Sequence, residues 1–355
     1  MDKTKKELIK ALAEVGECLS FFGENKSYSS FSKLVDRDLY DKINNAIELE
    51  QRYNGWFTPE NVRKSMLNIS KWLTEKSLNE WLGKSTFVEK PNNVGVIMAG
   101  NIPLVGFHDF ISVLLTGNKA TIKLSSDDKH LLPLVLDLIK IYYPAIDNLV
   151  SFSDAGNFKS IDALIATGSN NTARYFEKYF GHLPSIIRKN RTSIAILTGE
   201  ETDEELKSLG DDIFTYFGMG CRNVTQLFIH KEFDLDRFFG AIVNYSDVIN
   251  HNKYVNNYDY YKAIFLMNQE KLIENGFLLT KESNELFAPV GVLYRDYFDE
   301  IQEVEKFISE NKDEIQIVVG KNYIPFGKAQ NPSLTDYADG IDTVDFLTKL
   351  DKSYA

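Results

Sequence analysis

The stretch that decides the fold reads Val94-Gly95-Val96-Ile97-Met98-Ala99-Gly100-Asn101-Ile102-Pro103. A short apolar run that ends in glycine, asparagine and proline is typical of a buried strand that runs into a loop. The residues that follow predict a helix over 104–115, closed by Thr116-Gly117-Asn118, and a second strand over 120–124. A strand, a helix and a second strand in this order form the unit from which parallel sheets are built.

The same alternation continues along the chain. Apolar runs predict a helix over 131–142, a helix near Ala173, and strands near 149–152, 162–169 and 193–197. This pattern predicts an α/β fold with a mostly parallel, doubly wound sheet. Ligands of such sheets bind beyond the carboxyl ends of the strands, where Asn101, Lys123 and the turn Thr167-Gly168-Ser169 are expected. The sequence lacks Gly-x-Gly-x-x-Gly, the usual dinucleotide fingerprint.

The composition is that of a globular enzyme. Apolar residues make up 43% of the 355 residues and charged residues make up 26%, which are ordinary proportions. The net charge of -11 argues against a nucleic-acid-binding surface and against contact with an anionic membrane. A negatively charged protein can still bind an anionic cofactor, because backbone N–H groups and a few cations hold phosphates locally.

The cysteines and histidines are few. Two cysteines make no disulfide framework, so we expect a reducing, cytoplasmic location. Residues 1–8 lack the apolar core of a secretion signal, and no apolar run approaches the ~20 residues of a membrane span. The five histidines show no metal-ligand spacing, and we expect no metal site.

A second informative stretch, Gly218-Met219-Gly220-Cys221-Arg222, places a cysteine on a turn. Glycines beside a thiol let the backbone come close to a ligand and adopt conformations closed to other residues. Arg222 next to the thiol favours the thiolate, which is the nucleophilic form. The alternative is a small buried residue at a tight turn. Cys18 lies among the apolar residues of a predicted helix, and we interpret it as a packing residue.

Six segments, taken in order along the chain, resemble motifs of the aldehyde dehydrogenase superfamily. They are the asparagine-x-proline loop at 100–104, the lysine strand at 117–126, the threonine-glycine-serine turn at 167–169, the nucleophile at 220–221, the segment at 284–290 and the closing loop at 325–327. Three further segments, 187–192, 217–224 and 336–342, resemble the fatty-acyl-CoA reductases related to the reductase component of bacterial bioluminescence. The resemblance covers about residues 87–345.

The resemblance implies an aldehyde-dehydrogenase-like fold in three parts. A helical N-terminal segment is expected over 1–87, outside the core of the superfamily, where apolar residues recur at helical spacing. A cofactor-binding domain is expected over 88–210, completed by 321–355. A smaller α/β catalytic domain is expected over 211–320.

The resemblance also implies the roles of the reacting residues. Cys221 matches the nucleophile. Asn101 would donate to the carbonyl oxygen, on which acyl transfer and hydride delivery both place negative charge. Judged by local sequence alone, Asn101 is an equally good cap for the helix that follows.

The residues that would bind a nicotinamide cofactor follow in the same way. Lys123 would hold the adenosine ribose or its phosphate. The residues Thr167, Gly168 and Ser169 would form a loop–helix anion site for the pyrophosphate. Glu285 would contact the nicotinamide ribose, and Phe287 would pack against the ring.

Ser126 stands where NAD-preferring relatives place a glutamate for the ribose hydroxyls. Loss of that carboxylate removes repulsion against a 2′-phosphate, and the resemblance therefore implies NADPH (NADP) as the cofactor. Oxidising aldehyde dehydrogenases also carry a glutamate that activates the deacylating water. The matching region here, 188–192, has no carboxylate, and hydrolysis of a thioester on Cys221 should be slow.

These departures favour NADPH-dependent reduction of acyl-CoA, in particular fatty acyl-CoA, to aldehyde through a thioester on Cys221. One alternative keeps the fold and takes an acyl phosphate or a partner-bound acyl group, in which case an acyl-transfer protein is a partner. Another is a non-catalytic acyl-binding or scaffold protein. The chain after Cys221 is shorter than in full-length aldehyde dehydrogenases, which puts the usual oligomerisation hairpin in doubt and leaves a homo-oligomer open.

Overall fold

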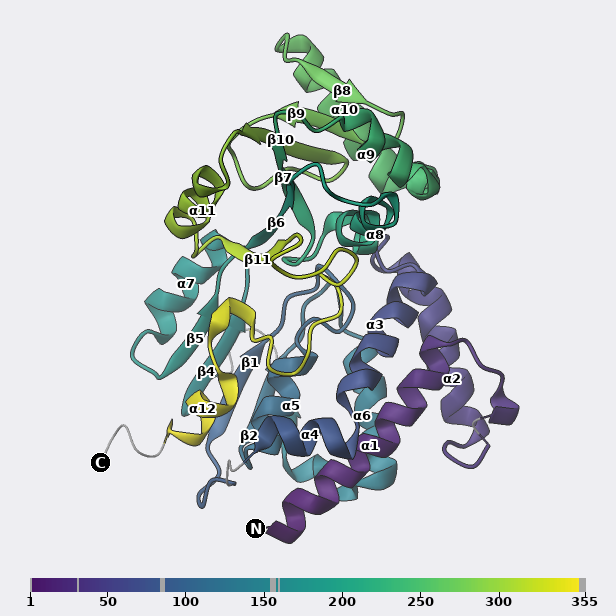
Figure 1. Ribbon diagram of the computed structural model, residues 1–355. Helices are drawn as coiled ribbons and strands as arrows, with labels where there is room; N and C mark the ends of the chain where they lie inside the picture. Colours follow the sequence, from purple (N-terminus) through teal and green to yellow (C-terminus); the bar gives the residue numbers. More distant parts are fainter. Residues whose placement is uncertain (1, 31, 84–86, 154–157, 159, 351–355) are drawn as a thin grey trace. The chain divides into compact units, whose positions relative to one another are not determined.

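Two sheets organise the chain, and each sheet belongs to its own unit (Figure 1). The structure is a computed structural model that describes residues 2–30, 32–83, 87–153, 158 and 160–350. The first unit comprises Met1–Lys189 and Ser333–Ala355, and the second comprises Asn190–Pro332. Residues 84–86 and 351–355, which the sequence assigned to the helical N-terminal segment and to the completing segment, lie outside the described residues.

The first unit is built around a parallel sheet with strand order β3-β2-β1-β4-β5. Its elements are α1 (Asp2–Gly23), α2 (Arg37–Leu49), α3 (Pro59–Trp72), α4 (Glu75–Leu82), β1 (Asn93–Ile97), α5 (Phe107–Leu115), β2 (Lys119–Lys123), α6 (Leu131–Tyr142), β3 (Val150–Phe152), β4 (Ala163–Thr167), α7 (Asn170–Phe180), β5 (Ser185–Arg188) and α12 (Thr343–Thr348). The predicted strand–helix–strand unit is confirmed, because β1 and β2 flank α5 and pair in parallel.

Helices cover both faces of this sheet, as expected for a doubly wound fold. Successive side chains of a strand point to opposite faces. In β4, Ala163 and Ile165 join the core cluster that includes α1, α3, α5 and α6. Leu164 and Ala166 instead join a cluster with Phe176 of α7. The near-continuous apolar sequence of β4 therefore reflects burial on both sides.

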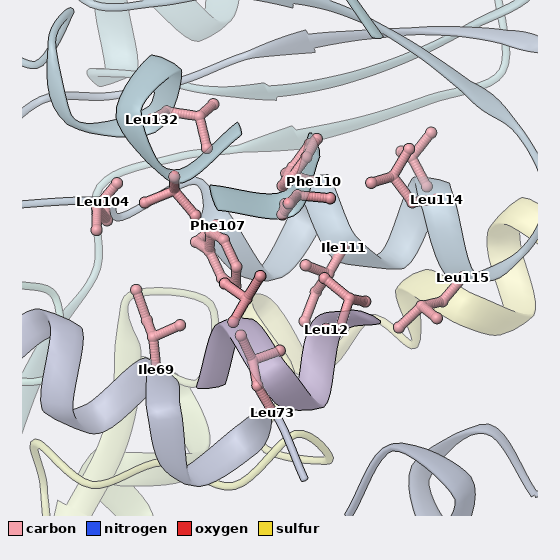
Figure 2. Close-up of a cluster of buried hydrophobic side chains, with 14 of the residues drawn as sticks. Leu12, Ile69, Leu73, Leu104, Phe107, Phe110, Ile111, Leu114, Leu115 and Leu132 are labelled. Carbon is pink, nitrogen blue, oxygen red and sulfur yellow. The ribbon is translucent and has the colours of Figure 1, made fainter. Parts of the chain in front are cut away.

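The helical N-terminal segment packs onto the first unit. Apolar residues at helical spacing bury one face of α1, and Leu12 is 0% exposed. Figure 2 shows Leu12 of α1 and Ile69 of α3 in one cluster with Phe107 and Ile111 of α5. The helix α3 begins with Pro59 in its first turn, after the cap Thr58. A single core thus joins the N-terminal helices to the helix that follows β1.

The second unit holds a mixed sheet of order β11-β6-β7-β10-β9-β8, in which β8 and β9 pair antiparallel. Its elements are β6 (Thr192–Leu197), α8 (Asp203–Phe214), β7 (Val224–His230), α9 (Leu235–Ala241), α10 (Asn252–Met267), β8 (Leu272–Glu274), β9 (Leu279–Glu282), β10 (Val292–Phe298), α11 (Ile301–Glu310) and β11 (Ile315–Val319). Alternate residues of β6 again divide between two clusters: Ala195 packs with α8 and α9, and Ile196 packs with α11.

The predicted alternation placed the strand over 193–197 in the first sheet. This prediction is wrong, because the strand lies in the second sheet. Only residues 189–191 separate β5 from β6, and a parallel neighbour needs a crossover of a dozen or more residues. The strand instead pairs with β7 and β11. Residues 190–210 therefore lie in the second unit rather than with 88–189, and the chain returns to the first unit at Ser333 rather than at residue 321.

We predict that Leu12→Ala lowers the free energy of unfolding of the first unit by about 2–5 kcal/mol, because it leaves a cavity in a fully buried cluster. Urea unfolding followed by tryptophan fluorescence measures this unit specifically, since the three tryptophans, Trp56, Trp72 and Trp81, all belong to it. Leu49→Ala is the control: Leu49 is 37% exposed and should cost less than about 0.5 kcal/mol. Equal losses in both variants would contradict the packing.

Candidate functional site

The turn before Cys221 has an unusual backbone. Tyr216, Phe217 and Gly218 are consecutive and all lie in the left-handed region, with φ of 54°, 56° and 78°. Aromatic residues rarely adopt this conformation, and each such residue costs of order 1–3 kcal/mol. The ring of Phe217 stacks on His251 at a centroid distance of 4.2 Å. Such a turn persists only where the surrounding structure holds it.

The side chain of Asn223 holds this turn. It is 0% exposed, and its Oδ1 accepts a hydrogen bond of 2.8 Å from the backbone N–H of Gly220. Its Nδ2 lies 3.0 Å from the carbonyl oxygen of Asp212, 3.2 Å from that of Ile213 and 2.9 Å from that of Thr215. One neutral amide therefore satisfies backbone groups on both sides of the strained residues.

The predicted closing loop is bound to the same turn. Asp212 is 0% exposed, and its carboxylate accepts the N–H of Gly327 at 2.7 Å and of Ala329 at 2.8 Å. Arg222 Nε donates to the carbonyl oxygen of Ala329 at 2.5 Å. The segment 325–329 and the cysteine turn thus form one network within the second unit.

The two cysteines have opposite surroundings. Cys221 is exposed, which contradicts the alternative of a buried residue at a tight turn, and its carbonyl oxygen accepts a hydrogen bond of 3.0 Å from Ser193 Oγ. Cys18 is 0% exposed and its Sγ lies 3.7 Å from the hydroxyl of Tyr142. This burial confirms Cys18 as a packing residue, and it raises the pKa of the Cys18 thiol to about 11.

The loop that carries Glu285 and Phe287 lies in the second unit with Cys221. Thr225 Oγ1, near the start of β7, donates to the carbonyl oxygen of Leu286 at 2.6 Å. Glu285 and Phe287 are both exposed, and Leu286 between them is buried. Burial, then the charge of Glu285 and a hydrogen bond with it, raise the pKa of Tyr294 to about 12. The strand that follows Cys221 is therefore tied directly to this loop.

The order of the first sheet identifies where its ligand-binding edge lies. The strand order β3-β2-β1-β4-β5 reverses direction between β1 and β4, and such switch points are where doubly wound sheets bind ligands. Gly100 and Asn101 lie just after β1, and Thr167 ends β4. The structure thus brings these two predicted segments to one edge of the sheet.

The turn from β4 to α7 is suited to an anion. Ser169 caps α7 and its Oγ accepts the N–H of Thr172 at 3.3 Å. The first turn of α7 contains no acidic residue. A Cβ on Gly168 would lie 3.0 Å from the Cβ of Thr172, so only glycine leaves this turn uncrowded. A helix N-terminus without carboxylates can accept phosphate oxygens.

Asn101 does not cap the helix that follows it. The cap position of α5 belongs to Gly106, and no side chain bonds there. Leu104 lies between them in the left-handed region with φ of 58°, and its side chain is buried among Phe107 and Leu132 (Figure 2). The loop is therefore anchored through Leu104, which leaves the half-buried Asn101 as its polar member.

Asp128 fixes this loop from the neighbouring one. Its Oδ2 accepts the N–H of Leu104 at 2.7 Å, and its Oδ1 is buried without a hydrogen-bond partner among the described residues. Burial raises the pKa of Asp128 from 3.8 to about 7, so near neutral pH both its forms are populated.

The two predicted cofactor residues near the end of β2 differ in exposure. Lys123 ends β2 and is half-buried, and Ser126 is exposed.

The region that matches the position of the missing glutamate is occupied by a buried cation. Arg188 ends β5 and is 4% exposed. Its Nη2 lies 2.7 Å from Asp109 Oδ1 and 3.0 Å from Thr343 Oγ1, and its Nη1 donates to the carbonyl oxygen of Ala338 at 2.6 Å. The arginine therefore holds the returning C-terminal segment on the first unit.

The predicted site residues divide between the two units. The first unit carries Asn101, Lys123, Ser126, Thr167, Gly168 and Ser169, and the second carries Cys221, Glu285 and Phe287. Sequence reasoning did not assign roles to Asn223 or Asp212, since a polar residue beside a turn is usually solvated; their burial is the signal. Within the described ranges, no group of three or more histidines, cysteines or acidic residues could hold a metal ion. Among the helices that the structure describes, none has the length and apolar character to cross a membrane.

The family model described as Acyl-CoA reductase (LuxC) matches residues 10–242. The chain belongs to this family. It is therefore an enzyme, an aldehyde-related oxidoreductase, and the fatty-acyl-CoA reductase resemblance is confirmed. The match includes residues 10–87 of the helical N-terminal segment as well as Cys221. No curated protein sequence matches the chain significantly.

Several solved structures that resemble the chain are aldehyde dehydrogenases. Aldehyde dehydrogenase 21 from Physcomitrella patens, in complex with the reaction product succinate, is 11% identical with a TM-score of 0.64, over 98% of this chain and 84% of that one. A putative aldehyde dehydrogenase, PutA, from Anabaena variabilis is 12% identical with a TM-score of 0.62, over 98% and 90%. The NAD+ complex of an aldehyde dehydrogenase from Bacillus cereus is 14% identical with a TM-score of 0.60, over 89% and 71%. These likenesses confirm the aldehyde-dehydrogenase-like fold.

We predict that Asn223→Ala releases the cysteine turn. The variant leaves four backbone groups without their partner, and each buried polar group left unsatisfied costs roughly 1–3 kcal/mol. Hydrogen–deuterium exchange of the peptide over 212–224 should become faster, and urea unfolding followed by circular dichroism should show a loss of at least about 2 kcal/mol.

Two further variants test that prediction. Asn223→Asp keeps the acceptor for Gly220 but sets a carboxylate against three carbonyl oxygens, so it should be as damaging as alanine. Asn244→Ala, at an exposed asparagine of the same unit, is the control and should leave exchange over 212–224 unchanged. Wild-type exchange in both Asn223 variants would show that other contacts hold the turn.

Proposed function

We propose that this enzyme reduces acyl-CoA, in particular fatty acyl-CoA, to aldehyde with NADPH through a thioester on Cys221. The observation that carries the proposal is the exposed Cys221 on a strained turn, fixed by the buried side chain of Asn223. Strained backbone of this kind clusters at functional sites, where it presents a reactive group. A packing cysteine would need neither the strain nor the exposure.

The proposed reaction consists of acyl transfer to Cys221 and then reduction of the acyl group by hydride. The thiolate of Cys221 attacks the thioester carbon of acyl-CoA; a new C–S bond forms, the bond to the CoA sulfur breaks, and CoA leaves. The acyl carbon then accepts a hydride, the C–S bond to Cys221 breaks, and the aldehyde departs while the thiolate is restored. The departing CoA thiolate takes up one proton. Asn101 is assigned as the side-chain donor to the carbonyl oxygen during both steps.

The residues of the first unit fit a nicotinamide dinucleotide. The β4–α7 turn offers a helix N-terminus without carboxylates for the pyrophosphate, and Lys123 and Ser126 follow β2 for the adenosine ribose and its 2′-phosphate. In the second unit, Glu285 and Phe287 are assigned to the nicotinamide ribose and ring. When bound, the reduced cofactor supplies the hydride.

The absence of a carboxylate over 188–192 supports reduction rather than acid formation. A hydrolysing relative needs a base to activate water. Here Arg188 is held by Asp109, and Lys189 pairs with Glu177 at 3.0 Å. A thioester on Cys221 should therefore survive until hydride or a thiol reaches it. Such chemistry and only two cysteines agree with a reducing, cytoplasmic location.

The test is single-turnover acylation. Labelled acyl-CoA should place a hydroxylamine-labile acyl group on Cys221, and Cys221→Ala should abolish the label and reduce turnover at least about a thousandfold. Cys18→Ala is the matched control and should keep the label. Label retained in Cys221→Ala would refute the nucleophile. Turnover of acyl phosphate but not acyl-CoA would change the donor, and a stable protein that is never acylated would indicate a binding or scaffold role.

We also predict which cofactor the enzyme prefers. Wild-type protein should bind NADPH more tightly than NADH, and Ser126→Glu should raise the Kd for NADPH about tenfold, ~1.4 kcal/mol, while that for NADH changes little. Ser126→Gln has nearly the same size without the charge and is the control. Titration of cofactor fluorescence gives all these constants. Tighter binding of NADH by the wild type would contradict the role of Ser126.

A further inference from the structure

We infer that Asn54, in the helical N-terminal segment, is a positioning residue that fixes the loop carrying Asn101 against the loop carrying Ser126. The inference rests on the proposed function, which assigns Asn101 to the carbonyl oxygen and Ser126 to the cofactor. It gives the N-terminal segment a role in the reaction, although that segment contributes no residue to the proposed chemistry. All groups concerned belong to the first unit.

The side chain of Asn54 bridges the two loops directly. Its Nδ2 donates to the carbonyl oxygen of Gly100 at 3.3 Å and to that of Asp127 at 3.3 Å. Its Oδ1 accepts the N–H of Trp56 at 3.1 Å, and the residue is 7% exposed. A carboxamide has two N–H donors, and here one serves each loop. The carbonyl of Gly100 belongs to the peptide bond of Asn101, and Asp127 directly follows Ser126.

The two loops need such a bridge, because their strands stop pairing before Asn101 and Ser126. The last ladder contact runs from the N–H of Met98 to the carbonyl oxygen of Lys123 at 3.0 Å. Beyond it, a Cβ added to Gly100 would lie 2.6 Å from Ser125 Oγ, so the loops touch. Touching surfaces can slide, whereas hydrogen bonds to both main chains define their register.

The segment that presents Asn54 has anchors of its own. The N–H of Asn54 donates to the carbonyl oxygen of Glu50 at 3.0 Å, and Phe57 is 0% exposed. The buried carboxylate of Glu50 lies 3.0 Å from Nδ1 of His130, ahead of α6. Loss of the Asn54 side-chain bonds should therefore loosen the two loops without detaching the helices.

The experiment compares Asn54→Asp with Asn61→Asp. The first keeps the acceptor for Trp56 and replaces the bridging N–H groups by an oxygen that faces two carbonyl oxygens. Asn61 belongs to the same segment and donates through Nδ2 to the carbonyl oxygen of Trp56 at 3.1 Å. The substitution Asn61→Asp therefore removes a comparable hydrogen bond that reaches neither loop. Asn54→Ser, which keeps one donor, is the milder variant and serves if Asn54→Asp does not fold.

Three measurements are made on the full chain. In Asn54→Asp, the Kd for NADPH should rise about tenfold and the rate constant for single-turnover acylation of Cys221 should fall about tenfold, ~1.4 kcal/mol each. Hydrogen–deuterium exchange should accelerate over 98–106 and 124–128 and stay unchanged over α1 and α6. Asn54→Ser should show the same pattern to a smaller degree. Asn61→Asp should leave all three measurements at the wild-type values.

The outcomes separate this inference from the proposed function. A wild type that is neither acylated nor able to bind NADPH refutes the proposed function, and local exchange over the two loops then decides whether Asn54 positions them. If the wild type reacts and Asn54→Asp reacts equally well, the inference is overturned. It is also overturned if Asn61→Asp shows the same losses, or if exchange accelerates uniformly across the first unit, because either result indicates general destabilisation.

Discussion

The buried carboxamide of Asn223 is the contact on which the presentation of Cys221 depends. Irregular backbone at the end of a sheet exposes N–H and C=O groups that no ladder satisfies, and burying them unpaired is costly. A carboxamide donates and accepts at once and carries no charge to desolvate. Asn118 does the same in the first unit: it is 0% exposed, accepts the N–H of Asn92 at 3.0 Å and donates to Thr116 Oγ1 at 3.1 Å.

Carboxylates fill similar positions under a tighter condition. Asp212 accepts two backbone N–H groups, one on each oxygen. Asp128 accepts one, and burial raises its pKa to about 7. Burial disfavours the charged form of an acid, whereas a carboxamide has no charge to desolvate.

Much of the fold could be predicted from the sequence, because the buried strands appear in it as short apolar runs. Val94–Ile97 and Ala163–Ala166 are apolar runs between loop signals, and the structure places strands on both. The sequence does not predict the short strand β5. It predicts Ser193–Leu197 as a strand but places it in the wrong sheet, because a local pattern shows that a strand exists and not which strand it pairs with. The pairing is decided by the length of the connection, because the three residues 189–191 are too few for β6 to cross over and pair in parallel beside β5.

The candidate site was predictable only where chemistry leaves a local mark. Two glycines, Gly218 and Gly220, precede Cys221, and a helix cap follows Gly168. The partners of those residues carry no such mark. Asn54, Gly100 and Asp127 lie far apart in sequence and meet only after α3, β1 and β2 have packed. The sequence around Asn54 therefore cannot distinguish an asparagine that bridges two loops from any other asparagine before a turn.

The contacts of residues 188–191, which connect the two units, explain why this segment carries cations and no carboxylate. Lys189 pairs with Glu177 at 3.0 Å, and Arg191 donates to the carbonyl oxygen of Lys312 at 3.0 Å. These two residues and the buried Arg188 fasten each end of the crossing to its own unit. A lone carboxylate in place of Arg188 would face Asp109 in a buried setting, where two like charges raise the free energy of both. The buried arginine and the lack of a water-activating carboxylate over 188–192 are thus one feature of the chain.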